Sequence, residues 1–387
     1  MSDHQVSAPN LAELQTHTSA KWRSFPKDVL PLPVAEMDYP VAEPIRALLT
    51  EMVAKSDLGY LDSIPELGAG FHKFASKRWG WNLDPLQVRA ATDVGVAVVE
   101  ILRIFTQPGD SILISSPVYH NFYTWIKETK LHPVDVPFER VGDESKNPWE
   151  INWDGIEKAY SAGIKVHLLC SPHNPLGRIY SKEELLRLVA LAKKHNVLII
   201  SDEIHAPLTY KGEKFIPFLS LGKEAEEVCV TVTAASKGWN IAGLKCAIIV
   251  TQNDALNNRL NELTPAMHYR ASILGGFATA VAFSEGEVWL DSILENLDHN
   301  RMMIKDLLAA KLPSVRYHIP QNSYLAWLDL EALKLGNDPT LTLIKNGRVA
   351  FNAGHTFGAQ CSQYVRLNFA TSPTIVTEAI DRIARSI

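Results

Sequence analysis

The amino-acid sequence predicts an α/β protein with a larger domain on a mainly parallel central sheet and a smaller α+β C-terminal domain. Short, uniformly apolar runs of strand length alternate with amphipathic segments through the middle of the chain, which is typical of strands covered on both faces. After about residue 286 this alternation stops. The chain of 387 residues, of which 46% are hydrophobic, is long enough for two domains.

Apolar residues with i, i+3, i+4 spacing predict the helices, and short apolar runs predict the strands. The helices are expected at 42–55, 65–79, 181–194, Glu287–Leu312 and from about Pro373 onward. The strands of the larger domain are expected at Ser111–Ser115, Lys165–Leu169, Val197–Ser201, Val228–Val232 and Cys246–Val250. Those of the smaller domain are expected at Val315–Tyr317, Ser323–Leu330 and Tyr364–Asn368, and 141–150 is expected to be a polar loop.

Composition excludes several classes of protein. The 38 basic and 43 acidic residues give a net charge of -5, and no long Lys/Arg block is present, so neither a nucleic-acid nor a membrane partner is expected. The four cysteines lie far apart without a CxxC pair, which argues against a zinc site and a disulfide framework. No secretory signal is recognised, and the longest uncharged stretch, 271–284, is too short to span a bilayer. We therefore expect a cytoplasmic protein.

Polar residues that could bind a ligand or take part in catalysis follow three of the predicted strands. Asn174 follows Lys165–Leu169, Asp202 follows Val197–Ser201, and Lys237 comes shortly after Val228–Val232. Open α/β sheets bind ligands at the carboxyl ends of their strands. Each residue alone also has a structural explanation: the aspartate as a helix cap, Asn174-Pro175 as a turn, and the lysine as a surface charge.

Together the three residues suit pyridoxal 5′-phosphate. That cofactor requires a lysine amine for its Schiff base and a carboxylate that keeps its ring nitrogen protonated. We assign Lys237 to the Schiff base, an ionised Asp202 to the pyridinium nitrogen and Asn174 to the phenolate oxygen. Tyr119, after the first strand, would stack on the ring, or would otherwise be an ordinary core aromatic.

A phosphate cradle is predicted where Gly95 opens a strongly helical pattern. The first N–H groups of a helix and its dipole favour an anion, so we assign the phosphate to Asp93, Val94, Gly95 and Val96. Simple N-capping by Thr92 or Asp93 is the alternative reading. A hydroxyl from Ser236 and a cation from Lys245 would complete the cradle.

Arg366 lies among apolar neighbours in the predicted strand Tyr364–Asn368. A guanidinium suits a carboxylate bidentately, so we assign Arg366 to the α-carboxylate of an amino-acid substrate. A structural ion pair with an acidic residue of the smaller domain is the alternative.

The sequence lacks the motifs of several other classes of enzyme and ligand-binding protein. Lys73 takes the place of the third glycine of a dinucleotide fingerprint at 68–73, and no P-loop, HExxH or GxSxG motif occurs. Asp202, Glu203 and His205 are too close in sequence to converge on one centre, so no metal site is expected.

The ordered set of motifs resembles a known family. Gly95, Pro117-Val118-Tyr119, Asn174-Pro175, 202–205 and Ser236-Lys237 resemble the fold-type I pyridoxal-phosphate enzymes of the class I/II aminotransferase group. The segments 21–40, 171–181, 201–210 and 236–245 are similar to the PatB/MalY group, whose members are carbon–sulfur β-lyases. The resemblance runs from about Lys21 to the C-terminus.

This resemblance implies a homodimer with active sites at the subunit interface, where Tyr60 reaches the phosphate of the partner subunit. It places Val34–Asp38, including Ala35 and Glu36, near the substrate carboxylate, and His205 near the phenolate oxygen. It implies an N-terminal arm (1–45) that joins the small domain (286–387), with a cofactor-binding large domain between them (46–285). Three positions depart from the pattern, namely Pro33, Ala234 and Lys245, where relatives carry tryptophan, a hydroxyl residue and arginine.

The resemblance implies that the enzyme cleaves L-cystathionine, L-cysteine or related S-conjugates by β-elimination, giving pyruvate, ammonia and a thiol. An aminotransferase acting on an L-amino acid would use the same residues as far as removal of the Cα proton. A protein that binds pyridoxal phosphate without catalysis, as a regulator, is the second alternative. Regulators with this fold carry an N-terminal DNA-binding domain, whereas only about twenty residues precede the matched region here.

Overall fold

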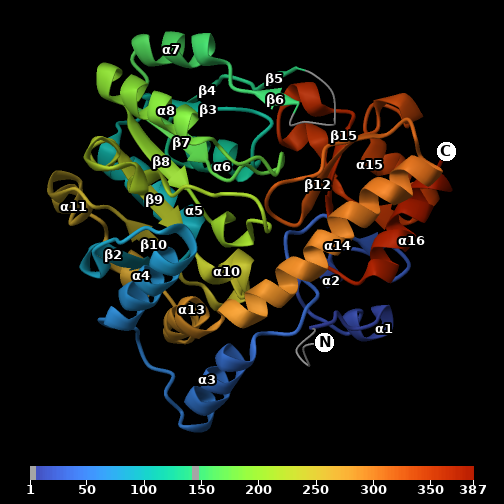
Figure 1. The fold of residues 1–387 in the computed structure, drawn as a ribbon, viewed down its shortest axis with the longest axis horizontal. Helices are drawn as coiled ribbons and strands as arrows, with labels where there is room; N and C mark the ends of the chain where they lie inside the picture. The colour runs from blue at the N-terminus through green and yellow to red at the C-terminus, as the bar shows by residue number, and fades with distance from the viewer. Residues whose placement is uncertain (1–5, 142–147) are drawn as a thin grey trace.

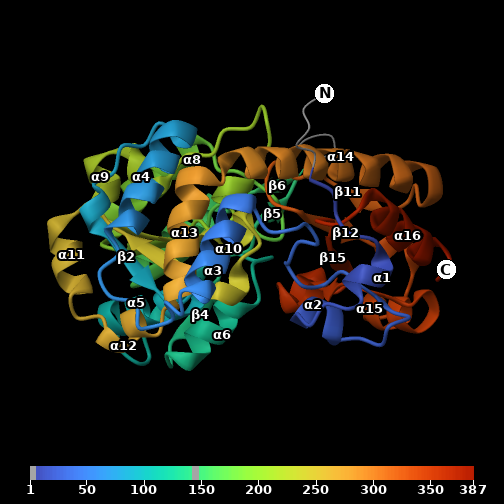
Figure 2. The same ribbon diagram turned by 90° about the horizontal axis from the view of Figure 1, so that it is seen from below.

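The computed structural model describes residues 6–141 and 148–387. Two bodies lie side by side, one built on a seven-stranded sheet and the other on a four-stranded sheet (Figure 1). Helix α14 (Glu287–Lys311) runs along both bodies (Figure 2). The predicted fold class, with a large and a small domain, is confirmed, whereas the exact boundaries at residues 45 and 285 stay predictions.

The large sheet has the order β2-β10-β9-β8-β7-β3-β4. Its strands are β2 (Val88–Ala91), β10 (Ala247–Val250), β9 (Cys229–Thr233), β8 (Leu198–Asp202), β7 (Val166–Cys170), β3 (Ser111–Ile114) and β4 (His132–Asp135). The five strands from β9 to β4 are mutually parallel. Every residue of β7, β9 and β10 is buried, as uniformly apolar runs predict for strands covered on both faces.

The sheet is mainly parallel, as predicted, and has two features that the prediction did not specify. Strand β10 is antiparallel to both neighbours, because the chain turns back after β9 through the segment that carries Lys237. Strands β2 and β4 were not predicted; both lie at edges of the sheet, where one side of the strand is unpaired and the apolar pattern is weak.

Helices cover both faces of this sheet. Helices α5 (Val94–Phe105) and α6 (Asn121–Glu128) share one apolar core with one face of the strands. Helices α4 (Pro65–Trp79), α7 (Trp153–Ser161), α8 (Lys182–His195) and α13 (Ile273–Glu285) pack on the other face. A Cβ on Gly70 of α4 would lie 2.7 Å from the carbonyl oxygen of Ala280, so glycine permits the close approach of α4 to α13.

The sequence signals that begin and end these helices are visible in the structure. Ser181 and Glu184 form a capping box at the start of α8, and Asn196 ends this helix in the left-handed conformation. The predicted helices 65–79 and 181–194 therefore agree with α4 and α8 to within one residue. The prediction 42–55 agrees with α3 (Glu43–Ala54), which projects from the large body in Figure 1.

The small body contains an antiparallel sheet of order β11-β12-β15-β14. Its strands are β11 (Arg316–Tyr317), β12 (Leu325–Asp329), β15 (Tyr364–Asn368) and β14 (Asn352–Ala353). The long helix α14 and the final helix α16 (Pro373–Ala384) pack against one another beside it. The N-terminal segment joins this body, because β1 (Leu30–Pro31) pairs in parallel with β13 (Val349–Ala350).

The remaining elements are short. They are α1 (Leu11–Leu14), α2 (Ala20–Arg23), β5 (Glu139–Arg140), β6 (Trp149–Glu150), α9 (Lys223–Glu226), α10 (Ala235–Gly238), α11 (Asp254–Leu260), α12 (Pro265–Tyr269) and α15 (Pro339–Thr342). Of the predicted loop 141–150, residues 142–147 lie outside the described part, and Trp149–Glu150 form a strand with β5. Within the described residues, no helix is long and apolar enough to cross a membrane.

Candidate active site

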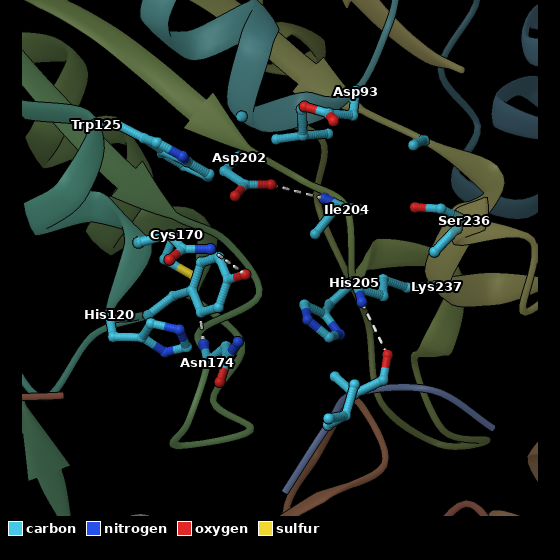
Figure 3. Close-up of a pocket in the computed structure, with 18 of the residues that line it drawn as sticks. Asp93, His120, Trp125, Cys170, Asn174, Asp202, Ile204, His205, Ser236 and Lys237 are labelled. Atoms are coloured by element: carbon cyan, nitrogen blue, oxygen red, sulfur yellow. Dashed lines mark hydrogen bonds between the residues drawn. The ribbon is translucent and has the colours of Figure 1, made fainter. Parts of the chain in front are cut away.

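A cavity of about 590 Å³ opens at the carboxyl ends of the parallel strands, between the two bodies. We call it the site cavity. The predicted residues that line it are Ala35, Asp93, Val94, Gly95, Tyr119, Asn174, Asp202, His205, Ser236, Lys237, Lys245 and Arg366. Figure 3 shows Asn174 and His120 on one side of this cavity and Ser236 and Lys237 on the other. Val96, Glu36 and Tyr60, which the sequence analysis also assigned to the site, are not among its lining residues.

Asp202 is the last residue of β8, so this strand ends one residue later than the predicted end at Ser201. Its carboxylate accepts a hydrogen bond from the N–H of Ile204 at 3.1 Å, so it also fills the turn-forming role that was the alternative reading. Burial raises the pKa of Asp202 to about 7, although this hydrogen bond and the charge of Lys237 partly oppose the shift. The predicted ionised carboxylate therefore needs a positively charged partner in the cavity to be fully ionised at neutral pH.

Lys237 lies on α10, the single helical turn that follows β9. Its Nζ donates to the carbonyl oxygen of Ala35 at 2.8 Å. Burial lowers the pKa of this amine to about 8, with a further contribution from the charge of Arg366. A lysine with such a pKa is neutral in a substantial fraction of molecules near neutral pH, as a base or nucleophile must be.

Arg366 enters the site cavity from β15 and is 2% exposed. Its Nη1 donates to Oδ1 of Asn174 at 3.1 Å and its Nη2 donates to the carbonyl oxygen of Pro33 at 2.9 Å. The guanidinium stacks on Phe357 with 4.9 Å between its carbon and the ring centroid. No described carboxylate forms an ion pair with it, and its buried Nε has no hydrogen-bond partner. The alternative of a structural ion pair is therefore wrong for the described part of the chain, and the arginine is poised to bind an anion.

The N-terminus of α5 faces the site cavity, as the helical pattern predicted. Asp93 caps this helix, because its carboxylate accepts from the N–H of Val96 at 2.8 Å. The N-capping alternative is thus correct, and the Val96 N–H that was assigned to a phosphate is engaged by a side chain. The N–H groups of Val94 and Gly95 have no acceptor within the helix and stay available for an anion. Nζ of Lys245 lies 3.1 Å from Oδ2 of Asp93.

Gly95 has a different local role from the one expected. A Cβ at this position would lie 2.8 Å from Cζ2 and 2.9 Å from Nε1 of Trp125, so glycine lets the indole of α6 pack against the helix N-terminus. Trp125 lines the site cavity and makes an edge contact with Tyr119, whose ring centroid is 5.9 Å away. The N–H₂ of Asn121 donates to the Tyr119 hydroxyl at 2.7 Å. Two aromatic rings, those of Tyr119 and Trp125, therefore line the cavity where the sequence predicted a single stacking ring.

His205 is buried, and its Nδ1 lies 3.0 Å from the hydroxyl of Ser323. Burial, together with the charges of Lys237 and Arg366, lowers the pKa of His205 to about 3, so its imidazole is neutral at physiological pH. A neutral imidazole can donate a hydrogen bond to a ligand oxygen without adding a charge.

Several lining residues were missed by the sequence analysis. They are His120, Asn121, Trp125, Cys170, Ile204, Ala242, Cys246 and Asn352, with Pro33, Val34 and Ala234 known only from the resemblance. Asn352 lies opposite Arg366 on the neighbouring strand β14, which is only two residues long and leaves no readable pattern. His120 directly follows the assigned Tyr119, whereas Trp125 lies within α6, so the helical spacing of α6 was the one signal for Trp125.

Comparison with known proteins agrees with this geometry. The sequence pattern of the family described as aminotransferase class I and II matches residues 27–383. The chain belongs to this family. The cystathionine beta-lyase of Corynebacterium glutamicum is 35% identical over 97% of this chain and 98% of its own length. The cystathionine beta-lyase PatB of Bacillus subtilis is 30% identical over 93% of each chain. Cystalysin from Treponema denticola, whose crystal structure contains pyridoxal 5′-phosphate, has a TM-score of 0.92 and 26% identity, with 100% of this chain and 99% of that chain covered.

Membership of the class I and II aminotransferases confirms the predicted fold-type I architecture, and the relatives confirm the resemblance to the PatB group. The cofactor of the family is pyridoxal 5′-phosphate, as the sequence predicted. The residues of the site cavity fit this group. Among the described residues no cation contacts the buried Asp202 directly, the first two residues of α5 line the cavity, and Lys237 lines it as well. When bound, the cofactor would be held by Lys237, Asp202 and the N-terminus of α5.

Proposed function

We propose that this protein is a carbon–sulfur β-lyase that cleaves L-cystathionine, L-cysteine or related S-conjugates to pyruvate, ammonia and a thiol. One geometric observation carries the proposal. Lys237, Arg366 and the buried Asp202 all line the same cavity. Amino-acid chemistry at Cα needs such a base, carboxylate clamp and buried acid. The full-length similarity to a cystathionine beta-lyase supports elimination over amino-group transfer.

Arg366 would bind the α-carboxylate of the substrate. Its Nη1 donates to Asn174 and its Nη2 to the Pro33 carbonyl, and each of these nitrogens carries a second N–H that could donate to the carboxylate. Because these contacts and the Phe357 ring fix the plane of the guanidinium, a carboxylate bound to it has one orientation. A fixed carboxylate limits the orientations that Cα of the substrate can adopt relative to Lys237.

Lys237 would take the Cα proton on Nζ. Its pKa of about 8 leaves part of the amine unprotonated near neutral pH, and burial is the main cause of that value. Pyridoxal phosphate, when bound, supplies the cationic ring that accepts the electrons of the Cα–H bond. Asp202 would pair with the protonated ring nitrogen, and that positive charge would lower the pKa of the carboxyl and favour its ionised form. As a Cα=Cβ bond forms, the Cβ–S bond would break, and the sulfur would leave with the bonding electrons and take up the proton held on Nζ of Lys237. One water molecule would then hydrolyse the remaining three-carbon fragment to pyruvate and ammonia.

We also propose a cytoplasmic homodimer in which Tyr60 reaches the phosphate of the partner subunit. Tyr60 is 88% exposed and lies outside the site cavity of its own chain, and the nearby Val53 and Leu58 are also exposed. Exposed apolar residues beside the projecting α3 are typical of a surface that another chain covers. The four cysteines are free thiols, which suits a reducing compartment. Sedimentation of the holoenzyme tests the dimer, and kinetics of Tyr60→Phe test the shared site.

The lyase proposal is tested with L-cystathionine as the substrate. The holoenzyme is expected to release pyruvate and free thiol in equal amounts, and a Lys237→Ala variant is expected to release neither. The same assay with an added 2-oxo acid measures amino-group exchange. Exchange without pyruvate would establish an aminotransferase. A coloured protein that binds the cofactor but turns over no amino acid would favour the non-catalytic regulator.

A further inference from the structure

The segment from Pro33 to Met37 is held by side chains at every backbone carbonyl. The donors are Arg366 on Pro33 (2.9 Å), Asn368 on Val34 (2.6 Å), Lys237 and Tyr324 on Ala35 (2.8 and 2.9 Å), Asn368 on Glu36 (2.6 Å), and Asn240 on Met37 (2.9 Å). Two of these donors, Arg366 and Lys237, are cationic side chains that line the site cavity. The carbonyls of Pro33 and Ala35 therefore fix Arg366 and Lys237 relative to each other.

We propose that Tyr324 is a positioning residue for Lys237 and acts through the carbonyl of Ala35, which is the docking point of the Lys237 amine whenever that amine is not bonded to the cofactor. This inference rests on the proposed role of Lys237 as the base. Tyr324 is not among the residues that line the site cavity, and its hydroxyl donates to the carbonyl of Ala35, which is one of them. Its effect has to pass through the carbonyl that it shares with the lysine.

The shared carbonyl orients the amine. A carbonyl oxygen has two lone pairs, and the Lys237 amine and the Tyr324 hydroxyl together occupy both. Because an amine donates along an N–H bond, the lone pair of a neutral Lys237 points away from Ala35. The docked amine is therefore held with its basic lone pair free to face the ligand.

The Tyr324 hydroxyl also weakens the hold of this carbonyl on a charged amine. Tyr324 is 1% exposed, and burial raises its pKa above the ordinary value, so the hydroxyl keeps its proton and donates. A donor that already draws on the oxygen leaves less electron density for a second, charged donor. The tyrosine thus favours the neutral form of Lys237 over the ammonium form.

The Ala35 carbonyl stays in place when the lysine leaves it. Asn368 donates to the carbonyls on both sides of Ala35, and Asn240 both accepts from the Met37 N–H at 2.8 Å and donates to its carbonyl. Asp38, at the end of the segment, forms a buried ion pair of 2.7 Å with Lys21 of α2. Removal of the Tyr324 hydroxyl alone leaves all of these contacts intact.

The test is a titration of the Lys237 amine in the full-length protein without cofactor. Competitive acetylation at a series of pH values, read by mass spectrometry of the Lys237 peptide, gives the pKa of that amine. We expect Tyr324→Phe to raise this pKa by roughly half a unit to one unit, the change that loss of one competing neutral hydrogen bond produces. The acid limb of kcat in the holoenzyme is expected to move to higher pH by the same amount, with KM for L-cystathionine within about twofold of the wild-type value.

Tyr317→Phe is the matched control, because this buried tyrosine also donates to a backbone carbonyl, that of Arg301, at 3.3 Å and outside the site cavity. It is expected to leave the Lys237 titration unchanged. An unchanged or lowered Lys237 pKa in Tyr324→Phe overturns the inference.

If Tyr324→Phe does not fold, a crystal structure of the wild-type protein without cofactor tests whether the Lys237 amine docks on the Ala35 carbonyl. Nζ of Lys237 within hydrogen-bond distance of the Ala35 oxygen supports the docking point, and an amine directed elsewhere refutes it. A protein that shows the titration shift but no lyase turnover would refute the proposed function and leave this inference standing.

Discussion

Replacement of Asp202 by asparagine is expected to stabilise the protein without cofactor while it abolishes most of the activity. Burial of the carboxyl raises its pKa from 3.8 to about 7. At 1.36 kcal/mol per pKa unit, ionisation of this buried carboxyl at pH 8 lowers the free energy of unfolding by about 4 kcal/mol at most. Asparagine has nearly the same shape and its Oδ1 can still accept the Ile204 N–H, but it carries no charge to desolvate.

The net gain is smaller than this limit, because the two Nδ2 donors of asparagine need acceptors that the carboxylate did not need. We expect the free energy of unfolding of Asp202→Asn without cofactor to exceed that of the wild type by about 1–3 kcal/mol at pH 8. The folded state binds this proton more tightly than the unfolded state. The contribution of Asp202 to wild-type stability therefore falls as pH rises from about 4 through 7, and the advantage of the variant over the wild type appears over the same interval.

Urea unfolding of both proteins at pH 5, 6, 7 and 8 measures this difference. Asp306→Asn on the exposed side of α14 is the control for removal of a negative charge, and we expect it to change stability by less than about 0.5 kcal/mol. Added pyridoxal phosphate should reverse the order, because only the wild-type carboxylate can pair with a protonated ring nitrogen. An Asp202→Asn advantage that is absent at pH 8, or equal at every pH, would contradict the assignment of a desolvated carboxylate to this site.

Three further outcomes are expected. Arg366→Lys should lower kcat/KM for L-cystathionine roughly ten- to hundredfold, mainly by raising KM, because a lysine cannot hold the Pro33 carbonyl and a carboxylate in one plane. Arg301→Lys is the control, because Arg301 also stacks on an aromatic ring and donates to a backbone carbonyl. It should have no comparable effect on kcat/KM. The kcat of the wild-type holoenzyme should rise with pH and reach half its maximum near pH 8, the pKa of Lys237, and a flat profile from pH 6 to 9 would refute this amine as the base. Gly95→Ala should weaken cofactor binding, measured by equilibrium dialysis, because the new Cβ would lie only 2.8 Å from Cζ2 of Trp125 and would displace the indole. Retention of wild-type affinity would contradict this expectation and show that the indole can move freely.

The sequence by itself determined the elements whose pattern is local. The spacing of apolar residues located α4 at Pro65–Trp79, and the run Tyr364–Asn368 located β15 without error. Uniformly apolar runs located the buried strands, because burial on both faces leaves no alternation. The polar residues at the ends of β7 and β8 were also readable, since parallel strands bring their carboxyl ends to one edge.

Only the tertiary structure decided how the site is completed. Trp125, Asn352 and the carbonyl of Ala35 reach the site cavity through contacts between segments far apart in the chain, which side-chain patterns along one segment do not encode. Backbone carbonyls have no residue signature, so the docking of Lys237 on Ala35 was invisible in the sequence. The pKa values of Asp202 and Lys237 depend on burial, and burial is a property of the packed molecule. The sequence therefore determined which groups meet, and the packing decided their charge and orientation.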